Sequence, residues 1–268
     1  MNPAGALALK LVFTPVLVGA ASLAGRRWGS AVGGWLVGIP FTSAPVAFFL
    51  ALDNGPRFAA EAALGMMAGA ISQAAFCLVY AWTARRAGWA WAAHRAGWTI
   101  CLGAASGAFA VATLVLSPLR PSAAASFALV VVILVVALFF MPGRKEPASE
   151  QTALPRWDIP ARMLVATAFV LALTTAAPAL GARLAGLIAP FPLYATVLTV
   201  FAHRLQGRDA ATGVLRGLLL GLFAFASFFL ALALLLEVSV ALAFAVAVAV
   251  ALVVQTASLL AGRRLGLA

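Results

Sequence analysis

The chain of 268 residues is 65% hydrophobic and only 9% charged. Because soluble domains carry about 25% charged residues, this composition excludes a water-soluble protein. The formal net charge of +11 at pH 7 matches that of nucleic-acid-binding domains, but basic residues in the loops of a membrane protein produce the same excess, so no nucleic-acid partner is predicted. The long, continuous apolar runs predict an all-α, polytopic helical membrane protein, because barrel strands would read as short alternating segments.

Nine apolar segments follow one another along the chain, each near the roughly 20 residues that a helix needs to cross a bilayer. They lie at 6–25, 30–52, 58–82, 97–116, 124–141, 160–178, 181–203, 213–235 and 238–261. The first segment also has the features of a signal peptide, and residues 87–96 have those of an interfacial stretch.

The basic residues orient these nine segments. Four of them fall on one side, namely Lys10, Arg57, Arg120 and Arg183, and the remaining fourteen fall on the other. By the positive-inside rule, this bias predicts a multi-pass protein of the bacterial inner membrane, with its N-terminus outside and its C-terminus in the cytoplasm. Lys10 is an irregularity within the first segment, and we expect it to snorkel outward.

The sequence also contains an internal repeat at an offset of 152 residues, where residues 29–77 align with 181–229. Five glycines of the first window then meet glycines of the second, whereas the glycine content predicts about one such coincidence. The pairs are Gly29 with Gly181, Gly34 with Gly186, Gly55 with Gly207, Gly65 with Gly217, and Gly69 with Gly221. Lys10 likewise aligns with Arg162, which favours a retained first helix over a signal peptide.

An odd number of segments separates the two copies, so the repeat is predicted to be inverted. The layout is a 5+4 repeat: residues 1–141 form the first copy with five helices, 142–159 a cytoplasmic linker, and 160–268 the second copy with four. This plan resembles that of several bacterial carrier families, drug and metabolite transporters among them, in architecture only.

Prolines interrupt the second and seventh segments at related places. Proline lacks an amide hydrogen and clashes with the carbonyl one turn earlier, so these two helices are predicted to be broken at membrane depth. We expect residues 38–45 and 189–196 to meet as a binding site, with the positive ends of the following half-helices favouring an anion or a polar oxygen. The predicted binding residues are Pro40, Thr42, Ser43, Pro45, Gln73, Pro190, Pro192, Tyr194 and Thr196. The alternative is that the prolines only bend the helices for packing, while the hydroxyl groups bond to the backbone.

Three charged residues are further candidates for ion coupling or anion contact: Glu61, Arg216 and Glu237. Each has a simpler interpretation, as an interface anchor near Arg57, a snorkelling side chain and a turn carboxylate, respectively. Gln73 fits either a helix–helix hydrogen bond or a substrate contact, and every aspartate is expected in a loop. Two GxxxG pairs, Gly65 with Gly69 and Gly217 with Gly221, predict close helix packing.

No catalytic or nucleotide-binding motif is present, and neither the two cysteines nor the two histidines have metal-site spacing. We therefore expect no enzyme activity, no cofactor and no metal. The predicted function is secondary transport of a small polar or anionic solute, or of a lipid-linked one, with membrane lipid as the other partner. A structural subunit of a membrane complex and a flippase-like lipid-handling protein are the alternatives. The oligomeric state stays open.

Overall fold

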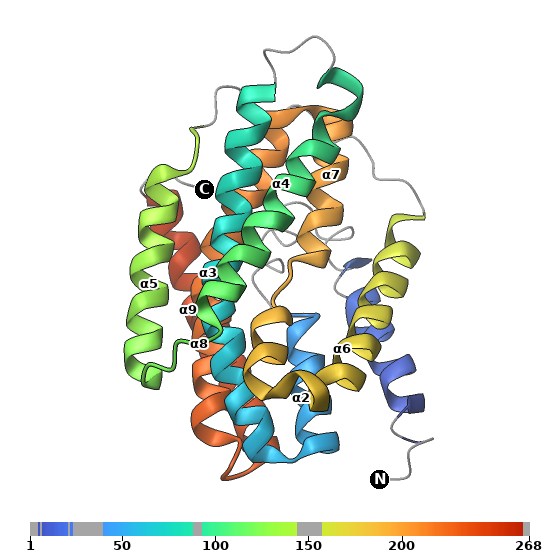
Figure 1. Ribbon diagram of the computed structural model, residues 1–268, viewed down its shortest axis with the longest axis vertical. Coiled ribbons are helices and arrows are strands. Elements are labelled where there is room, and N and C mark those ends of the chain that lie inside the picture. The colour runs from blue at the N-terminus through green and yellow to red at the C-terminus, as the bar shows by residue number, and fades with distance from the viewer. Residues whose placement is uncertain are drawn as a thin grey trace.

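The computed structural model describes residue 5 and residues 7–20, 22–23, 40–87, 93–143 and 157–264. All regular secondary structure in these ranges is helical, which confirms the predicted all-α class. An N-terminal apolar helix, Leu7–Ala20, precedes the labelled helices of Figure 1. These are α2 (Ser43–Asn54), α3 (Pro56–Ala87), α4 (Ala93–Leu116), α5 (Ala123–Phe140), α6 (Asp158–Ile188), α7 (Leu193–Gln206), α8 (Arg208–Leu235) and α9 (Val240–Arg264).

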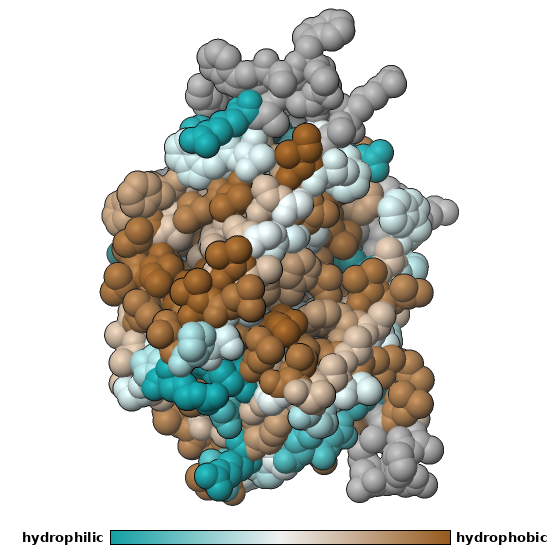
Figure 2. All heavy atoms as spheres, viewed as in Figure 1, coloured by the Kyte–Doolittle hydropathy of each residue, from teal (hydrophilic) through white to brown (hydrophobic). Residues whose placement is uncertain are grey.

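Six of the described helices are long and apolar enough to cross a membrane, namely α3, α4, α5, α6, α8 and α9. Figure 2 shows apolar side chains spread over the middle of one face, with the hydrophilic ones gathered mainly toward its two ends. Large exposed side chains such as Phe139 and Leu164, 81% and 71% exposed, suit a lipid-facing surface. These features identify the chain as a candidate multi-pass membrane protein.

The remaining helices are short. α2 has 12 residues and α7 has 14, so they are about 18 and 21 Å long and neither spans a bilayer core of about 30 Å. Nine full spans are therefore not found among the described residues. Residues 30–39, the first part of the predicted second segment, and residues 144–156 of the predicted linker lie outside the described ranges.

The predicted boundary between the sixth and seventh segments, at residues 178–181, coincides with a kink in α6. α6 consists of two helical stretches that meet at Gly181, whose φ of 77° and ψ of 157° are not helical. Glycine adopts this positive φ readily because it has no Cβ. The end of α6 is thus the first half of the predicted seventh helix, and α7 is its second half. α4 and α8 also begin four to five residues before their predicted starts, at Ala93 and Arg208, because polar first turns extend both helices beyond their apolar runs.

α3 and α8 form the centre of the bundle. In their apolar windows 72% and 67% of residues are buried, against 22–33% for the other four candidate spans. The two helices run in opposite directions (Figure 1). The contacts agree with this, since the end of α3 and the first part of α8 both meet the end of α5. Trp82 of α3 donates to the Phe140 carbonyl oxygen at 3.0 Å, and Arg216 of α8 donates to that of Pro142 at 3.0 Å.

The glycine pair of α3 makes the predicted close contact, against the last part of α6. A Cβ built on Gly65 would lie 2.7 Å from the Arg183 carbonyl oxygen, and one on Gly69 would lie 2.7 Å from Cγ of Pro190. Small residues here let the two backbones touch. Gly217 of α8, by contrast, has no atom within 4 Å of such a Cβ, so tight packing is not found there among the described residues.

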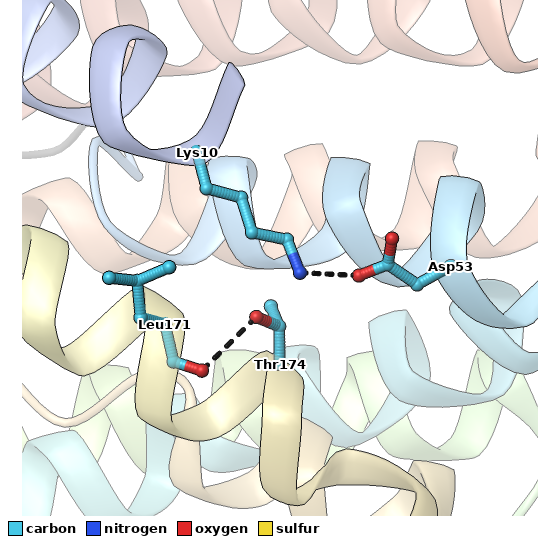
Figure 3. Close-up of polar contacts among 4 residues, drawn as sticks. All are labelled: Lys10, Asp53, Leu171 and Thr174. Atoms are coloured by element: carbon cyan, nitrogen blue, oxygen red, sulfur yellow. Dashed lines mark hydrogen bonds and ion pairs between the residues drawn. The ribbon is translucent and has the colours of Figure 1, made fainter. Parts of the chain in front are cut away.

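Lys10 does not snorkel outward as expected, and Asp53 is not in a loop. Lys10 is 9% exposed, and its Nζ lies 2.5 Å from Oδ2 of Asp53 in the last turn of α2 (Figure 3). Thr174 of α6 faces the same space. A buried ammonium group is costly without a partner, so the nearby carboxylate explains why Lys10 stays inside.

Candidate functional site

Two non-helical stretches, Pro40–Thr42 before α2 and Ala189–Pro192 before α7, meet inside the bundle. Oγ of Ser43, the first residue of α2, donates a hydrogen bond of 2.9 Å to the Ala189 carbonyl oxygen. That carbonyl has lost its helical donor, because the amide of Leu193 bonds to Phe191 instead, at 2.7 Å. The hydroxyl group of Ser43, next to the first stretch, thus pairs the free carbonyl group of the second. We refer to these two non-helical stretches as the breaks.

The two breaks line a cavity that encloses about 450 Å³ of empty space, including the part that is open to the outside. The centre of a water molecule can move within about 40 Å³ of it, enough for roughly three waters. The lining residues are Pro40, Phe41, Thr42, Ser43, Gln73, Pro190, Phe191, Pro192, Leu193, Tyr194, Ala195, Leu218, Leu222 and Phe225. The structure therefore brings seven of the nine predicted binding residues around one space.

The two predicted residues that do not line this cavity lie further along the half-helices. Pro45 is buried in the first turn of α2, where a missing amide hydrogen costs nothing, so it continues the helix instead of breaking it. Thr196 lies in the first turns of α7, and its buried Oγ1 has no hydrogen-bond partner among the described residues.

Gln73 reaches the cavity from the middle of α3. It is 6% exposed, and its Oε1 has no hydrogen-bond partner within the described ranges. The helix–helix hydrogen bond considered for Gln73 is made by its neighbour Ser72, which accepts one from Thr113 of α4 at 3.0 Å. A buried, unpaired amide oxygen beside an internal space is typical of a group that water or a ligand completes.

The first turns of α2 and α7 both border the cavity. Neither helix has a side-chain acceptor at its N-cap, Thr42 or Pro192. The amides of Ala44 and Leu193 bond to the carbonyl oxygens of Pro40 and Phe191, at 2.8 and 2.7 Å, but the start of each helix still carries the positive end of the helix dipole. The two half-helices therefore favour negative charge or hydrogen-bond acceptors at the same place.

A buried arginine, Arg162, contacts the ring of Tyr194. The sequence did not predict this contact. The guanidinium carbon of Arg162, from the first turns of α6, lies 4.7 Å from the centre of the Tyr194 ring. Arg162 is 4% exposed. It borders a second, smaller cavity with Val165, Ala166, Leu193, Tyr194 and Val197.

Sequence reasoning also missed the contribution of α8 to the lining. Leu218, Leu222 and Phe225 lie one turn apart and form one face of that helix. Phe225 aligns with Gln73 at the 152-residue offset, so the repeat could have predicted that Phe225 lines the cavity as Gln73 does.

The three candidate coupling residues do not line the cavity. Glu61 pairs with Arg120 at 2.9 Å, with the two side chains 49% and 67% exposed, and Glu237 is exposed in the turn between α8 and α9. Arg216 donates to the Met141 and Pro142 carbonyl oxygens at the end of α5.

Comparison with known proteins returned no match: no family model, no curated protein and no solved structure is significantly similar to this chain. Within the described ranges, no group of three or more histidine, cysteine, aspartate or glutamate side chains is arranged to hold a metal ion. The fold and the cavity therefore carry the functional inference by themselves.

Proposed function

We propose that this protein is a secondary transporter of the bacterial inner membrane that carries a small polar or anionic solute. The observation that supports this most is the meeting of two non-helical stretches, one before α2 and one between α6 and α7, at one internal cavity. Paired broken helices from two related halves form the substrate site in many carriers, with irregular backbone only where it lines a cavity.

The depth of the breaks fits a site near the bilayer midplane. α2 extends about 18 Å from its break, and α7 extends about 21 Å from its own. The two half-helices lead to opposite ends of the bundle (Figure 1), so the cavity lies about halfway along a total of roughly 40 Å. A bilayer with its headgroup regions has about that thickness.

Matched local geometry supports the inverted repeat. α2 ends at Asn54 and α7 at Gln206, which are 152 residues apart. Gly55 and Gly207 follow with φ of 89° and 91°, and α3 and α8 begin directly after them. Because α3 and α8 run in opposite directions, the same half-helix, glycine bend and long helix occur twice with opposite orientation. We infer that one half rocks against the other around the cavity.

The narrowness of the cavity also suits a carrier, because a solute larger than a few waters enters only if the breaks separate. An assembly subunit predicts no polar cavity between the halves, so the cavity favours transport over that alternative. Arg120 and Arg183 bond to Glu61 and to the Leu119 carbonyl oxygen, on the side where α5 begins, whereas Arg85 and Arg216 bond to the Gly143 and Pro142 carbonyl oxygens just after α5 ends. This grouping agrees with an external N-terminus and a cytoplasmic C-terminus.

A binding screen on the purified protein tests the proposal. We expect members of one chemical class to raise the melting temperature and to be taken up by proteoliposomes. Thr42→Val should weaken both effects at least tenfold, because Thr42 lines the cavity. Thr256→Val is the matched control, since Thr256 is exposed on α9 and its hydroxyl bonds to its own helix at Leu252. Binding unchanged by Thr42→Val, or lipid scrambling without solute uptake, would contradict the proposal.

A further inference from the structure

Tyr194 separates the central cavity from a buried arginine. Its side chain borders both the central cavity and the smaller one, which encloses about 200 Å³ of empty space. Arg162 lies on the far side of the ring, with its guanidinium carbon 4.7 Å from the ring centre. A turn of the Tyr194 side chain away from this position would join the two spaces and bring the guanidinium group to the solute.

The charge around the joined space has one sign. Among the described residues that line either cavity, Arg162 is the only charged one. The uncapped first turns of α2 and α7 add partial positive charge. A cation in such surroundings is unfavourable, whereas an anion meets attraction from three elements.

The repeat shows how the two halves differ at this point. Lys10 and Arg162 occupy matched positions, and each contacts the half-helix of its own half, α2 or α7. Lys10 pairs with Asp53, but the position of α7 that matches Asp53 holds Leu205. The position of α7 that matches Asp53 thus carries no carboxylate, and the contact between α7 and Arg162 is made by the ring of Tyr194.

The rest of the lining indicates what kind of anion fits. Phe41, Phe191 and Phe225 give the central cavity largely apolar walls, while Ser43 and Gln73 supply a few polar groups. A fully hydrated inorganic ion gains little from such walls, but an organic molecule buries its apolar part there. A guanidinium group binds carboxylate and phosphate oxygens through two parallel hydrogen bonds.

We propose that the transported solute is a small organic oxyanion with an apolar body, and that Arg162 behind Tyr194 is the charge that selects it. This inference rests on the proposed transport function and adds the substrate class. Tyr194 holds the guanidinium group in place by a cation–π contact while the site is empty.

A set of matched compounds tests the proposal by thermal shift and proteoliposome uptake with the full-length protein. Short aliphatic and aromatic carboxylates and phosphate monoesters are each compared with the uncharged amide or alcohol and with the amine of the same skeleton. Inorganic phosphate is included to separate the headgroup from the apolar body. We expect organic oxyanions to stabilise the protein, with at least tenfold weaker binding of the neutral and cationic analogues and of inorganic phosphate.

Variants then assign the charge. Arg162→Gln should reduce oxyanion affinity more than tenfold, and Arg162→Lys should retain part of it, because the charge remains without the planar fork. Arg57→Gln is the control, since it removes an equal charge from an exposed site at the start of α3. Each variant is measured against its own melting temperature without ligand, so a loss of stability is not read as a loss of binding.

The outcomes separate the two proposals. If neutral or cationic analogues bind as well as oxyanions, or if Arg162→Gln and Arg57→Gln behave alike, the oxyanion inference is wrong and transport of another solute still stands. If no compound of any charge binds or is taken up, both proposals are overturned.

Discussion

At the residue scale, the site depends on the side chain of Ser43, which supplies a hydrogen bond to an otherwise unpaired carbonyl group between α6 and α7. Ser43 is 2% exposed and donates to the carbonyl of Ala189 across 146 positions of sequence. A buried carbonyl without a donor costs about 1–3 kcal/mol. The hydroxyl group of Ser43 therefore stabilises the contact between the two breaks as well as lining the cavity.

We expect Ser43→Ala to lower the free energy of unfolding by about 1–3 kcal/mol, because it leaves the Ala189 carbonyl unpaired. Ser227→Ala is the matched control: Ser227 is also buried, but its hydroxyl bonds back to Phe223 one turn earlier in α8, so its loss should cost less than about 0.5 kcal/mol. Denaturant titration in detergent micelles measures both. If both variants lose the same free energy of unfolding, the hydrogen bond from Ser43 to Ala189 does not stabilise the protein more than a bond within one helix does.

At the scale of helices, backbone contact positions the second break. A Cβ added to Gly186 would lie 2.2 Å from the Ala62 carbonyl oxygen, so this part of α6 lies directly on α3. The GxxxG pattern of α3 predicted this contact surface. The segment boundary at 178–181 also predicted where the chain turns, at Gly181. The sequence did not reveal that the short stretch after the kink packs against α3, because that contact depends on how the helices are arranged.

Gly186→Ala should destabilise the protein by about 1–3 kcal/mol, because the added methyl group would force the backbones of α6 and α3 apart and disrupt their packing. Gly107→Ala should be neutral or stabilising, because Gly107 is exposed on α4 with open space around it and alanine favours helix. Melting temperatures of the two variants under identical conditions test this. A Gly186→Ala protein as stable as the Gly107→Ala protein would contradict the close packing of α6 on α3.

The ion pair between Lys10 and Asp53 holds the N-terminal helix to the end of α2, and it gives a second prediction at this scale. Replacing one partner alone, by Lys10→Met or Asp53→Leu, leaves the other charge partly buried and should cost about 1–3 kcal/mol, less than for a fully buried pair because Asp53 is 27% exposed. The double variant should recover much of that loss. A double-mutant cycle measures the coupling, and strictly additive losses would show that the two charges do not interact.

At the scale of the whole molecule, the sequence predicted the residues that line the cavity better than it predicted how the helices pack in the bundle. The prolines of the second and seventh segments pointed to six of the lining residues, because proline acts locally and the repeat links the two sites; the seventh, Gln73, was predicted as a polar residue in the middle of an apolar segment. The contact of Arg162 with Tyr194 and that of Lys10 with Asp53 join helices far apart in the chain. Such contacts depend on how the helices pack, which no local pattern encodes.

Thiol labelling from the two sides of the membrane tests alternating access at the cavity most directly. In a background with Cys77→Ala and Cys101→Ala, single cysteines replace Thr42 and Tyr194, which occupy matched positions of the two halves. Glu237→Cys and Arg208→Cys are exposed markers for the two ends of the bundle. Membrane-impermeant thiol reagents are then applied to sealed vesicles of either orientation.

Each marker should react from one side only, and the two markers from opposite sides. A transporter that opens in turn to both sides predicts that Thr42→Cys and Tyr194→Cys react from both. If these two positions react from a single side, or from neither while both markers react, the cavity is not an alternating solute site.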